Sequence, residues 1–141
     1  MLFTPHLLAG AAIGLVFEDW WWIIFLSLLF HLLFDLIPHF DPPYERTKKY
    51  YLWSSLDLLI GWLVAMWITN EVFSPLVLLG MLVSIIPDVL TFLVVSLRLR
   101  YLYGYVEFHK RIQTDWSWAG GMLMQLGVIA GIIYWRFFIY R

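Results

Sequence analysis

The chain contains no cysteine and few charged residues, and both shortages restrict the classes of protein to which it can belong. Without cysteine there is no disulfide scaffold, no thiolate metal site and no cysteine nucleophile. Only 13% of the 141 residues are charged, whereas 62% are hydrophobic, and the mean hydropathy is +0.80. The formal net charge of -1 offers no overall attraction to a polyanion, which argues against nucleic-acid binding. This composition is typical of a protein whose solvent is lipid.

Long apolar segments occupy most of the chain and predict an all-α, polytopic transmembrane helix bundle. A helix needs about 20 apolar residues to cross about 30 Å of hydrocarbon. Four segments near that length are bounded by polar or charged residues, namely 20–38, 51–73, 75–97 and 116–140, and the shorter segment 2–17 predicts a fifth, N-terminal crossing. Because these segments use most of the length, we expect a single membrane-embedded domain over residues 1–141.

Lysine and arginine predict how the bundle is oriented. With five crossings, the loops around 41–50 and 98–115 lie on the same side of the membrane as residue 1. That side carries seven of the nine basic residues, so the positive-inside rule places it in the cytoplasm of a multi-pass, inner-membrane protein. Four of these residues are predicted to bind the anionic head group of a membrane lipid, or else to serve only as the orientation signal: Arg98, Arg100, Lys110 and Arg111.

Ionisable residues inside the predicted spans are the most informative feature of the sequence. They are His31 and Asp35 in the second span, Asp57 in the third and Asp88 in the fourth. An aspartate at the centre of a span costs roughly 2.5 to 3.5 kcal/mol on insertion, so these groups should face one another, water or a cation. At 1.5 Å per residue they fall within roughly 5 to 14 Å of the cytoplasmic face, so we expect them to converge.

The histidines lie in the same half of the predicted bundle as these carboxylates. Where thiolates are absent, imidazole and carboxylate are the ligands that Zn²⁺ or another divalent first-row ion takes. The predicted metal ligands are His6, His31, Asp35, His39, Asp88 and His109. Asp41 and Asp57 are the candidate catalytic carboxylates, which would accept a proton from water. The alternative is a set of structural hydrogen bonds that tie the helices together.

Glycines in the last predicted span suggest close helix packing. Gly127 and Gly131 are four residues apart, which is the small-xxx-small spacing that lets two helices approach closely. The neighbour can belong to the same chain or to a second copy, so a homo-oligomer is one of two expectations.

Three short motifs resemble those of the YdjM-like predicted inner-membrane metal-dependent hydrolases. Residues 4–10, Thr-Pro-His-Leu-Leu-Ala-Gly, resemble the histidine-bearing start of that family's first helix. Residues 36–41 look like an altered version of its Leu-Pro-Asp-x-Asp-His corner, with residues 86–88 as a second candidate. Residues 109–115 are similar to its His-Arg-x-x-Thr-His-Ser element, although Asp115 and Trp116 replace the final His and Ser. The resemblance implies a divalent metal and hydrolase activity.

These observations lead to three hypotheses about function. The leading one is a membrane metal-dependent hydrolase that cleaves a lipid or lipid-linked (phospho)ester at the cytoplasmic face. The second is a small transport or assembly subunit that binds an ion or proton with buried Asp and His. The third is a non-catalytic membrane scaffold. The sequence has no Gly-rich phosphate loop, no Gly-x-Ser-x-Gly elbow and no His-Glu-x-x-His helix, so the common motif-defined enzyme classes do not apply.

Overall fold

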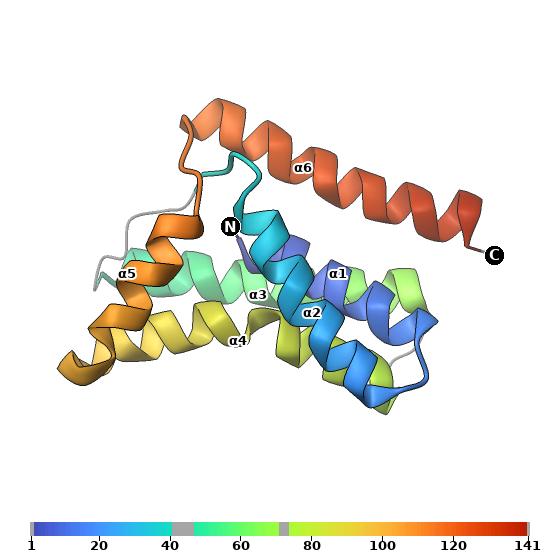
Figure 1. Cartoon of the computed structure of the whole chain (residues 1–141). Helices are drawn as coiled ribbons and strands as arrows, with labels where there is room; N and C mark the ends of the chain where they lie inside the picture. Colours follow the sequence, from blue (N-terminus) through green and yellow to red (C-terminus); the bar gives the residue numbers. More distant parts are fainter. Residues whose placement is uncertain (1, 41–46, 71–73, 141) are drawn as a thin grey trace.

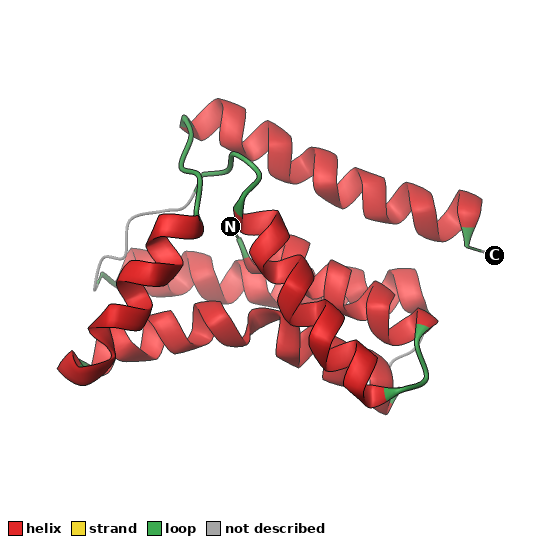
Figure 2. Cartoon of the chain, in the orientation of Figure 1, coloured by secondary structure: helices red, strands yellow, loops and turns green. Residues whose placement is uncertain are grey.

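The structure is a computed structural model that describes residues 2–40, 47–70 and 74–140. Within these ranges every regular element is a helix (Figures 1 and 2), which confirms the all-α prediction. The helices are α1 (Phe3–Val16), α2 (Trp20–Asp35), α3 (Lys48–Thr69), α4 (Pro75–Leu97), α5 (Tyr103–Ile112) and α6 (Trp118–Tyr134). A short 3₁₀ helix, η1 (Arg100–Leu102), leads into α5, and a π-helical turn, η2 (Trp135–Ile139), continues α6.

Three of the described helices are long and apolar enough to cross a membrane. They are α3, α4 and the continuous segment Trp118–Ile139 formed by α6 and η2. Helices α1 and α2 have 14 and 16 residues, which makes them about 21 and 24 Å long and shorter than the ~30 Å hydrocarbon layer. Helix α2 stops before the predicted end of its span because a proline at position 38 disfavours helical backbone at the preceding residue. A membrane protein is thus supported, whereas a count of four or five spans is not confirmed.

Helix α1 is the most deeply buried helix and packs against α2, α3 and α4. Its close contact with α4 depends on two glycines. A Cβ added at Gly10 would lie 2.6 Å from both the Gly80 carbonyl carbon and the Ser84 hydroxyl, and one added at Gly14 would lie 2.7 Å from the backbone of α4. Gly10 and Gly14 have the small-xxx-small spacing of closely packed membrane helices. The two helices therefore meet backbone to backbone.

The glycine pair singled out in the last span is placed differently. A Cβ added at Gly127 or Gly131 would meet no atom within 4 Å. Neither glycine supports packing within the described part of the chain, and the expectation of a second copy at this face stays a prediction.

The buried N-terminus of α1 is completed by side chains from other helices. The Asp57 carboxylate of α3 accepts hydrogen bonds from the Phe3 amide and the Thr4 hydroxyl, both at 2.6 Å. The Gln125 side-chain oxygen of α6 accepts one from the Leu2 amide at 2.9 Å. The first amides of a helix have no partner within the helix, and a carboxylate also complements the positive end of its dipole. Asp57 thus caps α1.

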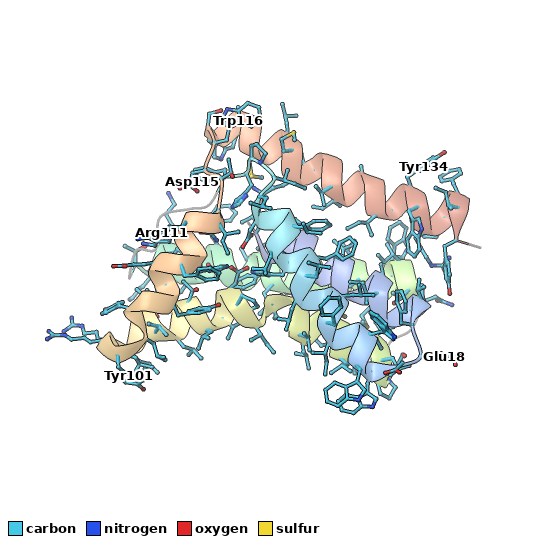
Figure 3. The ribbon with its side chains drawn as sticks, viewed as in Figure 1. Glu18, Tyr101, Arg111, Asp115, Trp116 and Tyr134 are labelled. Atoms are coloured by element: carbon cyan, nitrogen blue, oxygen red, sulfur yellow. The ribbon has the colours of Figure 1, made fainter. Side chains whose placement is uncertain are left out.

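The chain has two distinct ends along the helix axes (Figure 3). Glu18, in the turn between α1 and α2, lies at the same end as Tyr134, whereas Tyr101, Arg111, Asp115 and Trp116 lie at the other. This is the separation of loops that the topology prediction requires. The assignment of the basic end to the cytoplasm stays a prediction.

Candidate metal centre

Five buried ionisable side chains from four helices converge near the basic end of the bundle. His6 comes from α1, His31 and Asp35 from α2, Asp88 from α4 and His109 from α5. Their exposed fractions lie between 0% and 5%, so the cluster is sealed from solvent and from lipid. All five are among the metal ligands predicted from the sequence.

The Asp35 carboxylate lies at the centre of the cluster and approaches all three histidines. Its Oδ2 is 3.0 Å from His109 Nε2 and 3.2 Å from His31 Nε2. Its Oδ1 is 3.3 Å from His6 Nε2. His31 and Asp35 are four residues apart on one helix, so they share a face.

The side chains of Asp88 and His6 are buried without a hydrogen-bond partner among the described residues. The Asp88 oxygens are 3.8 Å from His109 Nε2 and 3.7 Å from His6 Nε2, which is too far for a hydrogen bond. Among the described residues, neither oxygen of Asp88 and neither ring nitrogen of His6 has a hydrogen-bond partner. Burial of an unpaired carboxylate is costly, and a cation bound between these groups would offset that cost.

Backbone and hydroxyl groups of α4 orient two of the imidazoles. His31 Nδ1 donates to the Ser84 carbonyl oxygen at 2.7 Å, and because a carbonyl can only accept, Nδ1 must carry the proton. In the neutral ring, Nε2 then presents its lone pair to the cluster. His109 Nδ1 is hydrogen-bonded to the Thr91 hydroxyl at 2.9 Å, which also turns its Nε2 inward. Metal-binding histidines characteristically hold their second nitrogen in this way.

The spacing of the inward-facing atoms suits a metal ion. One ligand atom from each of His31, Asp35, Asp88 and His109 lies within 4.8 Å of all the others, and the two histidine Nε2 atoms are 3.2 Å apart. Nitrogen and oxygen ligands lie about 2.0 to 2.2 Å from Zn²⁺, which puts neighbouring ligands of one ion roughly 3 to 3.5 Å from each other. The group could therefore hold a divalent cation with little rearrangement.

Helix α5 is held against the cluster by contacts at both of its ends. Tyr105 donates its hydroxyl proton to the Pro87 carbonyl oxygen at 3.0 Å, and burial raises the pKa of Tyr105, which keeps the hydroxyl protonated. After α5, the backbones of His39 and Asp115 form an isolated parallel bridge. The Thr114 amide also donates to the Asp35 carbonyl oxygen at 3.1 Å. These contacts fix His109 beside Asp35.

The other residues predicted for the site lie apart from the cluster or outside the described residues. His39 is buried, and its Nδ1 donates to the Ile37 carbonyl oxygen at 2.7 Å. It is not one of the four described residues whose ligand atoms all lie within 4.8 Å of one another. Asp57 caps α1. Asp41 lies outside the described residues. The four basic residues predicted to bind a head group are all exposed: Arg98, Arg100, Lys110 and Arg111.

Two polar residues support the site or its helices in ways that were not predicted from the sequence. Gln125 joins α6 to the rest of the bundle, because its amide group donates to the Phe40 carbonyl oxygen and accepts from the Leu2 amide. A lone Gln in an apolar span was the available signal. Tyr105 carried no such signal, because tyrosines are common near membrane interfaces.

Comparison with known proteins gave no match to a family model, to a curated protein or to a solved structure. The resemblance to the YdjM-like hydrolases stays a prediction, and function must be inferred from the chemistry of the buried cluster.

Proposed function

We propose that the protein is a membrane-embedded metal-dependent hydrolase that cleaves a lipid or lipid-linked (phospho)ester. The observation that carries the proposal is the convergence of three imidazoles and two carboxylates in a sealed cluster. Within it, the side chains of His6 and Asp88 are buried and have no hydrogen-bond partner in the part of the chain that the structure describes. Structural hydrogen bonds alone would leave these polar atoms unsatisfied, whereas a cation would engage them.

The residues of the cluster have different roles in the proposed reaction. The histidine Nε2 atoms and the carboxylates would hold the ion, while Ser84 and Thr91 keep two of the imidazoles turned toward the centre of the cluster. When bound, a divalent ion polarises an ester and lowers the pKa of water toward ~7. Asp57 is engaged by the N-terminus of α1, so Asp41 is the more favourable of the two candidates for accepting the proton of water.

The basic residues at the same end suit an anionic substrate. Lys110 and Arg111 directly follow His109 along α5, and their side chains are exposed while that of His109 is buried. Basic side chains at a membrane surface attract anionic lipid head groups, by about 1 kcal/mol each. A phosphate-bearing lipid held there would lie close to the helix that supplies a metal ligand.

The burial of the cluster favours one alternative, a subunit that binds or relays an ion or proton. No side chain in the charged pairs of the cluster is more than 6% exposed. A small cation or a proton needs only a slight opening to reach such a site, whereas a lipid ester requires a helix such as α5 to move. The two functions are separated by turnover.

The test uses full-length protein purified in detergent, with Asp35→Asn as the decisive variant. Asn keeps the shape of the side chain but removes the charge that faces three histidines. We expect wild type to retain divalent metal through dialysis and to hydrolyse phospholipid in mixed micelles, and Asp35→Asn to insert normally but to lose both. Asp57→Asn is the matched control, a buried aspartate outside the cluster, and should keep its metal. Metal-loaded wild type without turnover on any lipid phosphoester would favour the ion-binding alternative, and Asp35→Asn with full metal content would refute the site.

A further inference from the structure

We propose that the cluster holds two divalent ions, bridged by the carboxylates of Asp35 and Asp88. This inference rests on the proposed function for its chemical meaning, but the number of ions can be measured without any substrate. It follows from the way in which the two oxygens of each carboxylate face different histidines.

Asp35 divides its two oxygens between two sides of the cluster. Oδ2 faces His109 and His31 at 3.0 and 3.2 Å. Oδ1 faces His6 at 3.3 Å. A carboxylate that meets different imidazoles through different oxygens has the arrangement of a bridge between two cations.

Asp88 shows the same division. Its Oδ1 is nearest to His109 at 3.8 Å, and its Oδ2 is nearest to His6 at 3.7 Å. The five residues therefore form two sets that share both carboxylates. The first set has His31 and His109, and the second has His6.

The position of His6 argues against a single shared ion. Ligands on opposite sides of one ion are at most about 4.4 Å apart when each bond is near 2.2 Å. The group whose atoms all lie within 4.8 Å of one another contains His31, Asp35, Asp88 and His109 but not His6. One ion bound by that group would leave His6 without a ligand role.

The stacking of His6 on His31 gives the spacing that two ions require. The ring centroids are 4.1 Å apart and the planes are inclined by 27°, and both Nε2 atoms approach Asp35. Nearly parallel imidazoles place two ions side by side at about their own separation, and two-metal sites have ions about 3.5 to 4 Å apart.

Hydrogen bonding supports a second ion independently of these distances. Both ring nitrogens of His6 and both oxygens of Asp88 are buried and have no hydrogen-bond partner within residues 2–40, 47–70 and 74–140. An ion between His6 Nε2, Asp35 Oδ1 and Asp88 Oδ2 would give two of these four atoms, His6 Nε2 and Asp88 Oδ2, a partner.

The charge of such a centre indicates the class of substrate. Two carboxylates and three neutral imidazoles balance one divalent ion, so a second ion leaves an excess of positive charge in a buried site. An anionic group would neutralise this excess, which favours a phosphoester over an uncharged ester. Binding of the second ion should therefore be strengthened by inorganic phosphate.

The experiment counts ions in full-length protein, using Mn²⁺ because pairs of Mn²⁺ ions give a spin-coupled paramagnetic resonance signal. Protein in detergent is stripped with a chelator and loaded with Mn²⁺ in the presence and absence of inorganic phosphate. Bound metal is measured after desalting. We expect two ions per chain and a coupled signal in wild type with phosphate. His6→Asn, which removes Nε2, should bind one ion and lose the coupling.

The matched control is His39→Asn, which removes the same nitrogen from a buried histidine outside the cluster and retains a donor for the Ile37 carbonyl oxygen. It should keep two coupled ions. One ion per chain in wild type with phosphate, or an uncoupled signal at two ions, would overturn the proposal even if His6→Asn fails to fold. Two coupled ions without turnover would support the ion pair and refute the hydrolase proposal. One ion with turnover would refute the ion pair and support the hydrolase proposal.

Discussion

The contact between α1 and α4 gives a sharp prediction, because Gly10→Ala should disturb both the fold and the metal centre. The added Cβ would lie 2.6 Å from the Gly80 carbonyl carbon and from the Ser84 hydroxyl. Unstrained carbon contacts are about 3.5 Å, so the two helices must separate by about 1 Å. Overpacking of this kind typically costs about 1 to 3 kcal/mol.

The same displacement would open the metal centre, since His6 is on α1 and Asp88 is on α4. Their facing atoms are 3.7 Å apart, and Ser84, which would be pushed by the new methyl group, holds His31 through its carbonyl oxygen. Loss of such supporting contacts usually lowers metal affinity by about 10- to 100-fold. We expect Gly10→Ala to bind Mn²⁺ more weakly by a factor in this range.

The assay measures Mn²⁺ affinity by chelator competition and the free energy of unfolding in detergent. Gly127→Ala is the matched control, because a Cβ there meets nothing within 4 Å. It should leave affinity unchanged, and its stability should stay the same or rise by up to about 1 kcal/mol through helix propensity. Equal metal affinity and stability in Gly10→Ala and wild type would refute the backbone-to-backbone packing and the coupling derived from it.

Two further predictions follow from single contacts, and a third follows from the placement of the loops at opposite ends of the bundle. Thr91→Val removes the hydroxyl that orients His109, so metal affinity should fall by about 10- to 100-fold. Secondary structure, measured by circular dichroism, should be unchanged, and a metal affinity equal to that of wild type would show that the hydrogen bond is dispensable. Asp57→Asn weakens the cap of α1 and should lower the free energy of unfolding by about 0.5 to 2 kcal/mol without changing the metal content. A variant that keeps its metal but loses turnover would instead support the catalytic role predicted for Asp57. Single cysteines at positions 18 and 111 should be labelled by impermeant thiol reagents from opposite sides of the membrane, and labelling of both from one side would refute the topology.

Helix positions could be predicted from apolar segments where charge or proline marks both ends. The predicted span 75–97 matches α4, because a proline stands at its first position and Arg98 adopts a left-handed conformation just after its last. Hydropathy was less informative for α1 and α2, because the apolar character continues into turns where the helix has ended. The small-residue spacing predicted close packing at Gly127 and Gly131, but Gly10 and Gly14, which have the same spacing, make the close contact between α1 and α4.

The candidate site could be predicted largely from the energetic cost of polar groups in lipid. That cost indicated that His31, Asp35 and Asp88 must meet a partner, and the structure brings them together. It could not identify the partner of each carboxylate. Asp57 meets the amides at the start of α1 and Asp35 meets imidazoles, and both partners satisfy the same requirement. Only the three-dimensional positions of α1 and α5 separate the two cases.

The short, buried first helix explains how a small membrane protein can place unpaired polar groups far from water. A helix exposed to lipid must span the bilayer and hide its polar side chains, but a helix enclosed by protein needs to do neither. Residues 4 to 11 of α1 are all buried, and its glycines let α4 approach closely enough for His6 to face Asp88. A larger residue at Gly10 would restore ordinary helix spacing and withdraw His6 from the carboxylates. The packing of α1 is therefore a condition for the proposed metal centre, and the 14-residue length that makes this helix a poor membrane span is compatible with its place inside the bundle.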